Sequence, residues 1–427
     1  MRHETATAGR RSARSSHDNP GDGGLNFDLS DEQAMLRDLV QRFGADRYDA
    51  AKRLAYLREP RGFADANWAM LAETGLLAFA LSEEAGGFGG SPVDIITVME
   101  ALGRFVAVEP VLPALILSAG LVAAAGTQDQ KDALLPAITG GEAIVALALF
   151  ETQARFGLDR LRTRVTAGRI SGVKQMVLGG GHADRFIVAA RTGDGAPLTL
   201  HLVEADAPGV SIDPYRLVDG SHAADVRFAD TPAEPMAGGE AELAGVMDQA
   251  RLAVSAELLG LMEMMFAATL DYLKTRQQFG QPLGSFQALQ HRMADCYARL
   301  ELSRSQLYRA AGAGADGRAA AIIGAKAYIA QSAVHIGEES VQLHGGIGTT
   351  EELLVGQAFK RVMALVTLLG DVDHDMDAYR TMTTKAARED QRAHDGKLSS
   401  GGRGQRDRGS GNDAVHRQWL ARAALQG

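Results

Sequence analysis

The chain has 427 residues, 46% of them hydrophobic, and a formal net charge of −9. This length exceeds the roughly 250–300 residues at which a single core stops growing, so we expect two or three packed domains. The acidic balance argues against a general nucleic-acid binder, because neutralising phosphates requires clustered Lys and Arg. The single cysteine, Cys296, excludes an intrachain disulfide and a multi-cysteine metal site. It fits a reducing, cytoplasmic location, and we expect its side chain to be buried.

Both ends of the chain predict disorder. Residues 1–24 contain several arginines among Ser, Gly and Thr, but no apolar region follows, which excludes a secretory signal. Residues 386–427 are mostly polar and glycine-rich and cannot bury enough apolar surface to order themselves. We therefore predict a disordered extension and a disordered tail.

Residues 25–138 have the pattern of an N-terminal helical domain. Ser30 followed by Gln33 is a capping-box signature, and apolar residues recur on one helical face after it. The longest uncharged stretch, from Pro110 to Gln128, is long enough to span a membrane. Its prolines and small residues favour a buried helix instead, so we predict no membrane span.

Residues 139–240 change to short β-rich runs separated by turn residues, which predicts a middle domain built on an antiparallel sheet. Helical spacing returns over residues 241–385, where long apolar-striped segments predict a C-terminal four-helix bundle. Met262, Met264 and Met265 in this region fit core filling better than a ligand site. The fold class is therefore α+β.

Two motifs in the C-terminal region carry chemistry. Arg276 begins the run RQQFGQPLGSFQ, and its guanidinium could bind two phosphate oxygens at once. Some sixty residues later, Gln342, Gly345 and Gly346 follow an apolar helix. Consecutive glycines allow a backbone to approach an anionic ligand closely.

The order of the three domains, together with these motifs, resembles the acyl-CoA dehydrogenase family over about residues 27–379. The resemblance implies an acyl-CoA substrate, FAD as cofactor and an electron-transfer acceptor. It further implies that Arg276, with Gln278 and Phe279, reaches FAD held mainly by a neighbouring subunit, and that the Gln342–Gly346 turn does the same. Glu351 and Arg361 also match family positions, as ion pairs between helices, whereas His344 and His374 are expected to be structural.

The residue that would act as base departs from the family pattern. Removing an α-proton requires a carboxylate whose pKa is raised by burial. The usual glutamate position corresponds to Gly370, and the alternative family position, before Arg251, corresponds to Ala250. The catalytic residue is therefore unknown, with Asp371 as a candidate displaced by one position.

The middle domain departs as well, because the stretch ALFETQARFGLDRLRT lacks the T-E-P…G-S-D pattern with which family members contact the flavin ring. Several segments instead resemble the partner subunits of bacterial heterotetrameric acyl-CoA dehydrogenases. We therefore predict α,β-dehydrogenation of an acyl-CoA by an α2β2 complex in which a second subunit supplies the base. Two alternatives remain open: a self-sufficient homotetramer using Asp371 or another carboxylate, and a noncatalytic scaffold without flavin.

Overall fold

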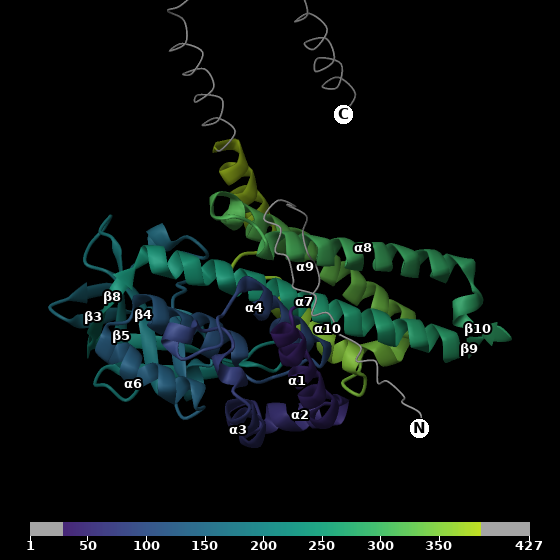
Figure 1. The fold of residues 1–427 in the computed structure, drawn as a ribbon, viewed down its shortest axis with the longest axis horizontal. Helices are drawn as coiled ribbons and strands as arrows, with labels where there is room; N and C mark the ends of the chain where they lie inside the picture. The colour runs from purple at the N-terminus through teal and green to yellow at the C-terminus, as the bar shows by residue number, and fades with distance from the viewer. Residues whose placement is uncertain (1–28, 386–427) are drawn as a thin grey trace, which may run out of the picture. The chain divides into compact units, whose positions relative to one another are not determined.

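Helices, a β-sheet and a second set of helices follow one another along the chain (Figure 1). The computed structural model describes residues 29–385, so the predicted extension 1–24 and tail 386–427 lie outside the described residues. Residues up to Met376 belong to one compact unit, and residues 377–385, the described part of a second unit, are helical. The predicted three-part α+β architecture is confirmed.

The N-terminal domain is helical. Ser30 caps its first helix through the predicted capping box, in which its hydroxyl accepts from the Gln33 amide and the Gln33 side chain accepts from the Ser30 amide. The domain comprises α1 (Asp31–Arg47), α2 (Ala50–Arg58), α3 (Asp65–Glu73), η1 (Leu76–Ala78), η2 (Glu83–Ala85), α4 (Pro92–Arg104), η3 (Leu112–Ala119), α5 (Gly120–Ala125) and α6 (Gln128–Thr139).

The uncharged stretch after Pro110 forms a π-helical segment, η3, that continues into α5, and most of its side chains are buried. Two other helical segments, α7 (Glu240–Thr275) and Ala315–Thr349, are long and apolar enough to cross a membrane, yet 72% and 61% of their most apolar 18-residue stretches are buried within the fold. Such burial is typical of core helices in a bundle.

The middle domain holds one eight-stranded sheet in the order β6-β7-β3-β2-β4-β5-β8, with β1 paired to β4. Most neighbours are antiparallel, but β1 and β2 run parallel to β4, so the sheet is mixed rather than purely antiparallel. Its elements are β1 (Val145–Ala148), η4 (Leu158–Arg160), β2 (Arg164–Thr166), β3 (Arg169–Leu178), η5 (Gly180–His182), β4 (Arg185–Arg191), β5 (Leu198–Glu204), β6 (Val210–Arg216), β7 (His222–Pro232) and β8 (Glu234–Gly239).

A β-bulge interrupts the pairing of β3 with β7 between Lys174 and Val177. Met176 lies within the bulge at φ +51°, and its amide donates to Asp225 Oδ1 over 3.2 Å. Bulges re-aim side chains, and here Lys174 is fully buried while Met176 faces a cavity described below.

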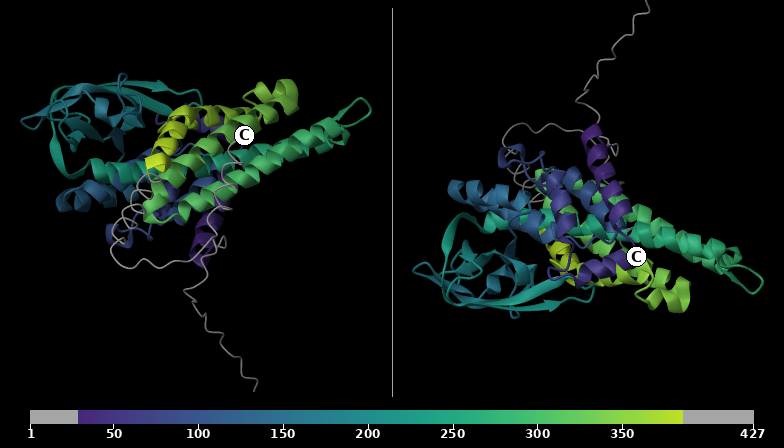
Figure 2. Two further views of the ribbon diagram at one scale, coloured as in Figure 1. Left: turned by 90° about the horizontal axis from the view of Figure 1, so that it is seen from above. Right: turned by 90° about the horizontal axis from the view of Figure 1, so that it is seen from below.

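The C-terminal domain is built around α7, which packs on α4 of the N-terminal domain and on α8, α9 and α10 (Figure 2). Its elements are α7 (Glu240–Thr275), β9 (Gln277–Gln278), β10 (Gln281–Pro282), η6 (Leu283–Ser285), α8 (Gln287–Ala311), η7 (Ala315–Gly317), α9 (Arg318–His344), η8 (Gly345–Thr349) and α10 (Leu354–Leu365). Met262, Met265 and Cys296 are buried and Met264 packs against the same core, as expected.

Two glycines allow α4 and α7 to cross almost in backbone contact. A Cβ added at Gly103 would lie 2.4 Å from the Glu257 carbonyl oxygen, and one at Gly260 would lie 2.0 Å from the Glu100 carbonyl oxygen. Any larger residue would push the helices apart, so this crossing fixes the N-terminal domain against the bundle.

Candidate functional site

Arg276 lies where α7 ends and the chain enters a two-residue hairpin. Gln278 pairs with Gln281, which leaves Phe279 and Gly280 as the turn, both at positive φ as a type I′ turn requires. Arg276 and Gln278 are exposed, and Phe279 is 88% exposed. The Phe279 ring meets that of Phe286 edge to face, with centroids 6.1 Å apart.

Gln342, Gly345 and Gly346 form the turn at the end of α9. Gly345 adopts φ +67° and ψ −145°, and no atom lies within 4 Å of a Cβ built on Gly345 or Gly346. All three residues are exposed. The backbone of this turn is therefore open to close approach by a ligand.

The fold brings the two motifs to the same end of the bundle. The rings of Tyr272, one turn before Arg276, and His344, next to Gly345, stack with centroids 4.5 Å apart. Leu273 and Leu343 pack in one small cluster with Met293. Within residues 29–385 the Arg276 side chain makes no hydrogen bond or ion pair. An unpaired guanidinium beside an open glycine turn fits a pyrophosphate such as that of FAD.

A separate cavity of about 100 Å³ lies where the three domains meet. Leu112 of the N-terminal domain, Met176 and Leu178 of the sheet, and Leu365 and Leu368 of the C-terminal domain line its apolar part. Pockets that bury a drug-sized ligand measure roughly 300–1,000 Å³. The side chains therefore fill most of the space at this junction.

Four charged residues in the lining of this cavity, Arg361, Glu257, Asp219 and Arg53, tie the domains together. Arg361 of α10 donates to Glu257 of α7 over 2.6 Å and to Asp219 of the β6–β7 turn over 2.8 Å. Burial lowers the pKa of Arg361, but these two carboxylates outweigh it and raise that pKa overall. Arg53 of α2 donates to the Val106 and Asp219 carbonyls, and burial lowers its pKa to about 10.

Glu109 also lines the cavity and forms no ion pair within residues 29–385. Its carboxylate accepts from Tyr48 Oη over 2.5 Å and from Asn67 Nδ2 over 2.9 Å. Burial raises the pKa of Glu109 above its ordinary value, while these hydrogen bonds act in the opposite direction. Sequence reasoning missed this residue, although a lone charge beside a 19-residue uncharged stretch was a usable signal.

Position 370 is closed to any side chain. Gly370 adopts φ +135°, and a Cβ there would lie 2.2 Å from Asp375 Oδ1. Asp371 caps the following helical turn, because its Oδ1 accepts from the His374 amide over 2.9 Å, and its other oxygen pairs with Arg155. The His374 amide is the main cause lowering the pKa of Asp371, the opposite of what a general base requires. Ala250 is fully buried.

A second carboxylate near these positions was also missed. Asp248 binds Arg251 Nη1 over 2.8 Å, and Arg251 Nε in turn approaches the Leu369 carbonyl oxygen at 3.4 Å. Burial raises the pKa of Asp248 despite the Arg251 charge. Asp248 is absent from the lining of the three-domain cavity.

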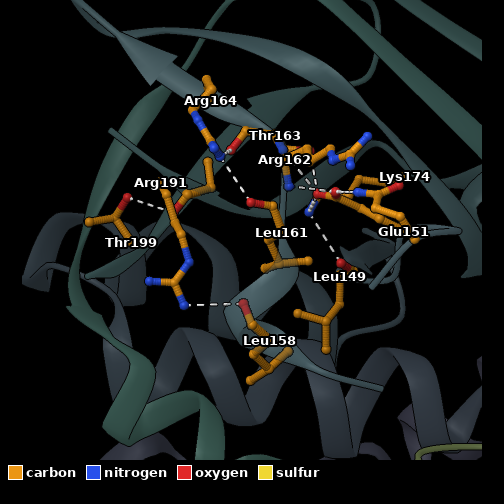
Figure 3. Close-up of polar contacts among 12 residues, drawn as sticks. Leu149, Glu151, Leu158, Leu161, Arg162, Thr163, Arg164, Lys174, Arg191 and Thr199 are labelled. Carbon is orange, nitrogen blue, oxygen red and sulfur yellow. Dashed lines mark hydrogen bonds and ion pairs between the residues drawn. The ribbon is translucent and has the colours of Figure 1, made fainter. Parts of the chain in front are cut away.

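The β1–β2 loop (residues 149–163) lacks the family's flavin-contacting pattern. Lys174, a buried residue of β3, holds it by donating to the Leu149 carbonyl oxygen and to Glu151 (Figure 3). Glu151 accepts from Lys174 Nζ over 2.7 Å, from Thr163 Oγ1 over 2.7 Å and from the Arg162 amide over 2.7 Å. Burial opposes ionisation, but the Lys174 charge and these donors lower the pKa of Glu151 to about 2. The loop tip reaches residues 371–374: Arg155 pairs with Asp371 and Phe156 packs on His374 at 5.0 Å.

The other matched positions have structural partners. Arg361 forms the predicted interhelical ion pair, whereas the exposed Glu351 pairs with Lys360 of α10. His344 Nδ1 donates to the Ser340 carbonyl oxygen over 2.8 Å. No cluster of three or more His, Cys, Asp or Glu side chains suited to a metal ion occurs in the described part of the chain.

Comparisons with known proteins point to one family. Its N-terminal domain model, acyl-CoA dehydrogenase N-terminal domain, matches residues 30–142, and the acyl-CoA dehydrogenase C-terminal domain model matches residues 238–378. The chain is similar to the acyl-CoA dehydrogenase IpdE2 of Mycobacterium tuberculosis, with 31% identity over 79% of this chain and 93% of that protein. It is 30% identical to mitochondrial isovaleryl-CoA dehydrogenase of Pongo abelii, over 79% and 85%.

Solved structures agree with this similarity. A variant of the steroid ACAD Tcur3481-Tcur3483 aligns with a TM-score of 0.76 and 30% identity, covering 84% of this chain and 99% of that one. The ChsE4-ChsE5 complex from Mycobacterium tuberculosis shares the fold, with a TM-score of 0.77 and 24% identity over 85% and 99%.

Proposed function

The chain belongs to the acyl-CoA dehydrogenase family, and we propose that it takes part in α,β-dehydrogenation of an acyl-CoA as the subunit without the catalytic glutamate in an α2β2 complex. The family comprises oxidoreductases that act on CH–CH groups with FAD as cofactor. When bound, FAD supplies the acceptor for the hydride that leaves the acyl β-carbon. The remaining question is what the residues of this chain contribute.

The proposal rests on how far Arg276 lies from this chain's own base position. Leu369, next to Gly370, contacts Arg251 of α7, and Arg276 follows 25 residues later on the same helix axis. At 1.5 Å per residue the two points are about 38 Å apart. Only a five-carbon ribityl chain joins the flavin ring of FAD to its pyrophosphate. One FAD therefore cannot touch Arg276 and place its ring beside Gly370 of the same chain.

We infer that Arg276 and the Gln342–Gly346 turn bind the pyrophosphate of an FAD whose ring lies in a partner subunit. The guanidinium provides charge and two parallel donors, and the open glycine backbone allows close approach. Gln278 and the exposed Phe279 would line the same site at the subunit contact. The partner would then supply the glutamate that removes the α-proton.

The cavity of this chain also supports a flavin ring and a base located in the partner subunit. It measures about 100 Å³, and within it Asp219 and Glu257 are already bound by Arg361. Position 370 cannot carry a carboxylate without a clash. A chain with this cavity would bind a flavin and an acyl chain poorly.

The names of relatives support a heteromeric complex and a bulky substrate. The two-part names Tcur3481-Tcur3483 and ChsE4-ChsE5 favour a heteromeric assembly, and the steroid ACAD favours a bulky acyl group. An electron-transfer acceptor would reoxidise the flavin. A cytoplasmic location is consistent with the single buried thiol, Cys296.

A self-sufficient dehydrogenase is the second candidate, and Glu109 is the observation that favours it. It is a buried carboxylate in the cavity, its pKa is raised, and among the described residues no cation pairs with it. Perturbed carboxylates in clefts are frequent general bases. In this candidate Glu109, rather than Asp371, would remove the α-proton.

Expression of the chain alone and together with an acyl-CoA dehydrogenase-like chain that carries the glutamate separates these functions. We expect bound FAD and substrate-dependent bleaching of the flavin only in the co-expressed complex. Bleaching by the isolated chain, lost in Glu109→Gln, would refute the partner model and establish the second candidate. An assembled complex whose FAD content is unchanged by Arg276→Ala would remove Arg276 from the cofactor site.

A further inference from the structure

The turn at residues 369–375 is built around a glycine whose place leaves no room for a side chain. Gly370 adopts φ +135°, a region that residues with a side chain rarely enter. A Cβ at this position would meet Asp375 Oδ1 at 2.2 Å and His374 Cδ2 at 3.0 Å. The Asp375 carboxylate thus already occupies the space into which a side chain at 370 would point.

A buried lysine holds that carboxylate in place. Lys326 of α9 and Asp375 are 0% and 1% exposed at their side chains, and Nζ lies 2.7 Å from Oδ2. The same ammonium group donates to the Gly370 carbonyl oxygen over 2.6 Å. Lys326 therefore binds both ends of the turn and fixes the distance between them.

A buried ion pair is a poor device for stability alone, because desolvation offsets most of its attraction. Asp375 Oδ1, the oxygen that faces position 370, has no hydrogen-bond partner within residues 29–385. A group buried at such a cost needs another explanation, and the best attested use of buried polar groups is to specify one arrangement.

The outer side of the turn is held by the β1–β2 loop. Arg155 pairs with Asp371, and the Phe156 ring lies 5.0 Å from that of His374. Arg155 is 74% exposed, so its ion pair is weaker than the buried one. The loop that lacks the family's flavin-contacting pattern thus contacts the turn where the family glutamate would be.

We propose that Lys326 and Asp375 are positioning residues that lock residues 369–375 in a conformation incompatible with a carboxylate at 370. The inference rests on the proposed function and deepens it, because the base is excluded by the architecture of the turn and not by one substitution. Restoring glutamate at position 370 alone would clash with Asp375. A chain built in this way depends on its partner for the base.

A double-mutant cycle tests the lock in the full-length chain. Gly370→Ala should lower the urea midpoint, because its Cβ meets Asp375 and because the turn holds position 370 at φ +135°. In the background Lys326→Met with Asp375→Ala the turn can relax, and we expect this loss to fall to less than about half. An equal loss in both backgrounds would overturn the proposal.

The matched control removes another interhelical ion pair, Arg304→Met with Glu263→Ala. Glu263 lies 12 residues beyond Arg251 on α7, about 18 Å along the helix axis. In this background Gly370→Ala should cost as much as in the wild type. A reduced cost here would mean that the coupling reports general loosening of the bundle, which also overturns the lock.

A second readout serves if the double background does not fold. Asp375→Asn keeps the volume of the side chain but removes its charge, and we expect amides 369–375 to exchange at least about tenfold faster while other amides are unchanged. Unchanged exchange would refute the proposal. Neither readout depends on flavin or a partner, so a negative result in either one leaves the partner model intact. Dehydrogenation by the isolated wild-type chain would refute only the partner model.

Discussion

Replacing Arg276 with alanine should remove most FAD from the assembled complex without unfolding the chain. The Arg276 side chain is exposed and has no partner within residues 29–385, so its truncation should change the free energy of unfolding by less than about 0.5 kcal/mol. A hydrogen bond to a charged group is worth about 1.5–3 kcal/mol, which corresponds to a loss of roughly tenfold to hundredfold in affinity.

The assay is titration of the apo complex with FAD, followed by flavin fluorescence, together with a urea unfolding curve for the same sample. Arg276→Lys should give an intermediate affinity, because a lysine keeps the charge but cannot offer the planar pair of donors. Lys274→Ala is the matched control, since Lys274 is a neighbouring cation that is 61% exposed and pairs with Asp271. An unchanged FAD affinity in Arg276→Ala would remove Arg276 from the cofactor site.

Three further outcomes are expected. Arg361→Met should destabilise the chain by about 3–5 kcal/mol, measured as a lower urea midpoint, because Glu257 would remain buried and unpaired. Glu109→Gln should leave the activity of the assembled complex within a few-fold of wild type, whereas a loss of about a hundredfold or more would identify Glu109 as a base. Glu151 has its pKa lowered from 4.5 to about 2, so the stability that it contributes is present above pH 4.5 and lost as pH falls towards 2. Removing the charge of its partner in Lys174→Met should move this loss to higher pH, which acid-unfolding curves would detect.

Local patterns predicted the helical parts of the fold well. The capping box at Ser30, the helical spacing of α7 and the buried stretch after Pro110 each depend on neighbours in the chain, and each is present. The parallel pairing of β1 with β4 was not predictable in this way. Alternation of side chains identifies a strand but says nothing about which strand lies beside it or in which direction.

The candidate site, too, was predictable from the sequence only in part. The residue types of Arg276 and of the Gln342–Gly346 turn predicted an anion site, and the stacking of Tyr272 on His344 brings the two motifs together. Sequence spacing could not predict that Arg276 lies about 38 Å along α7 from Arg251, which contacts the Gly370 turn, because that distance depends on α7 continuing unbroken. It follows that one flavin cannot join the two places within one chain.

The absence of a base at position 370 has a different meaning in the sequence and in the structure. In the sequence Gly370 is a single missing carboxylate, which one mutation could restore. In the structure Lys326, 44 residues earlier, binds the Gly370 carbonyl, and the Asp375 carboxylate fills the space beside it. A lysine in a helical pattern is expected at the surface, so nothing in the sequence marks Lys326 as buried. Because the turn is held by residues from α9 and from the segment after α10, we expect that a return to a self-sufficient enzyme would require changes at Lys326, Gly370 and Asp375 together.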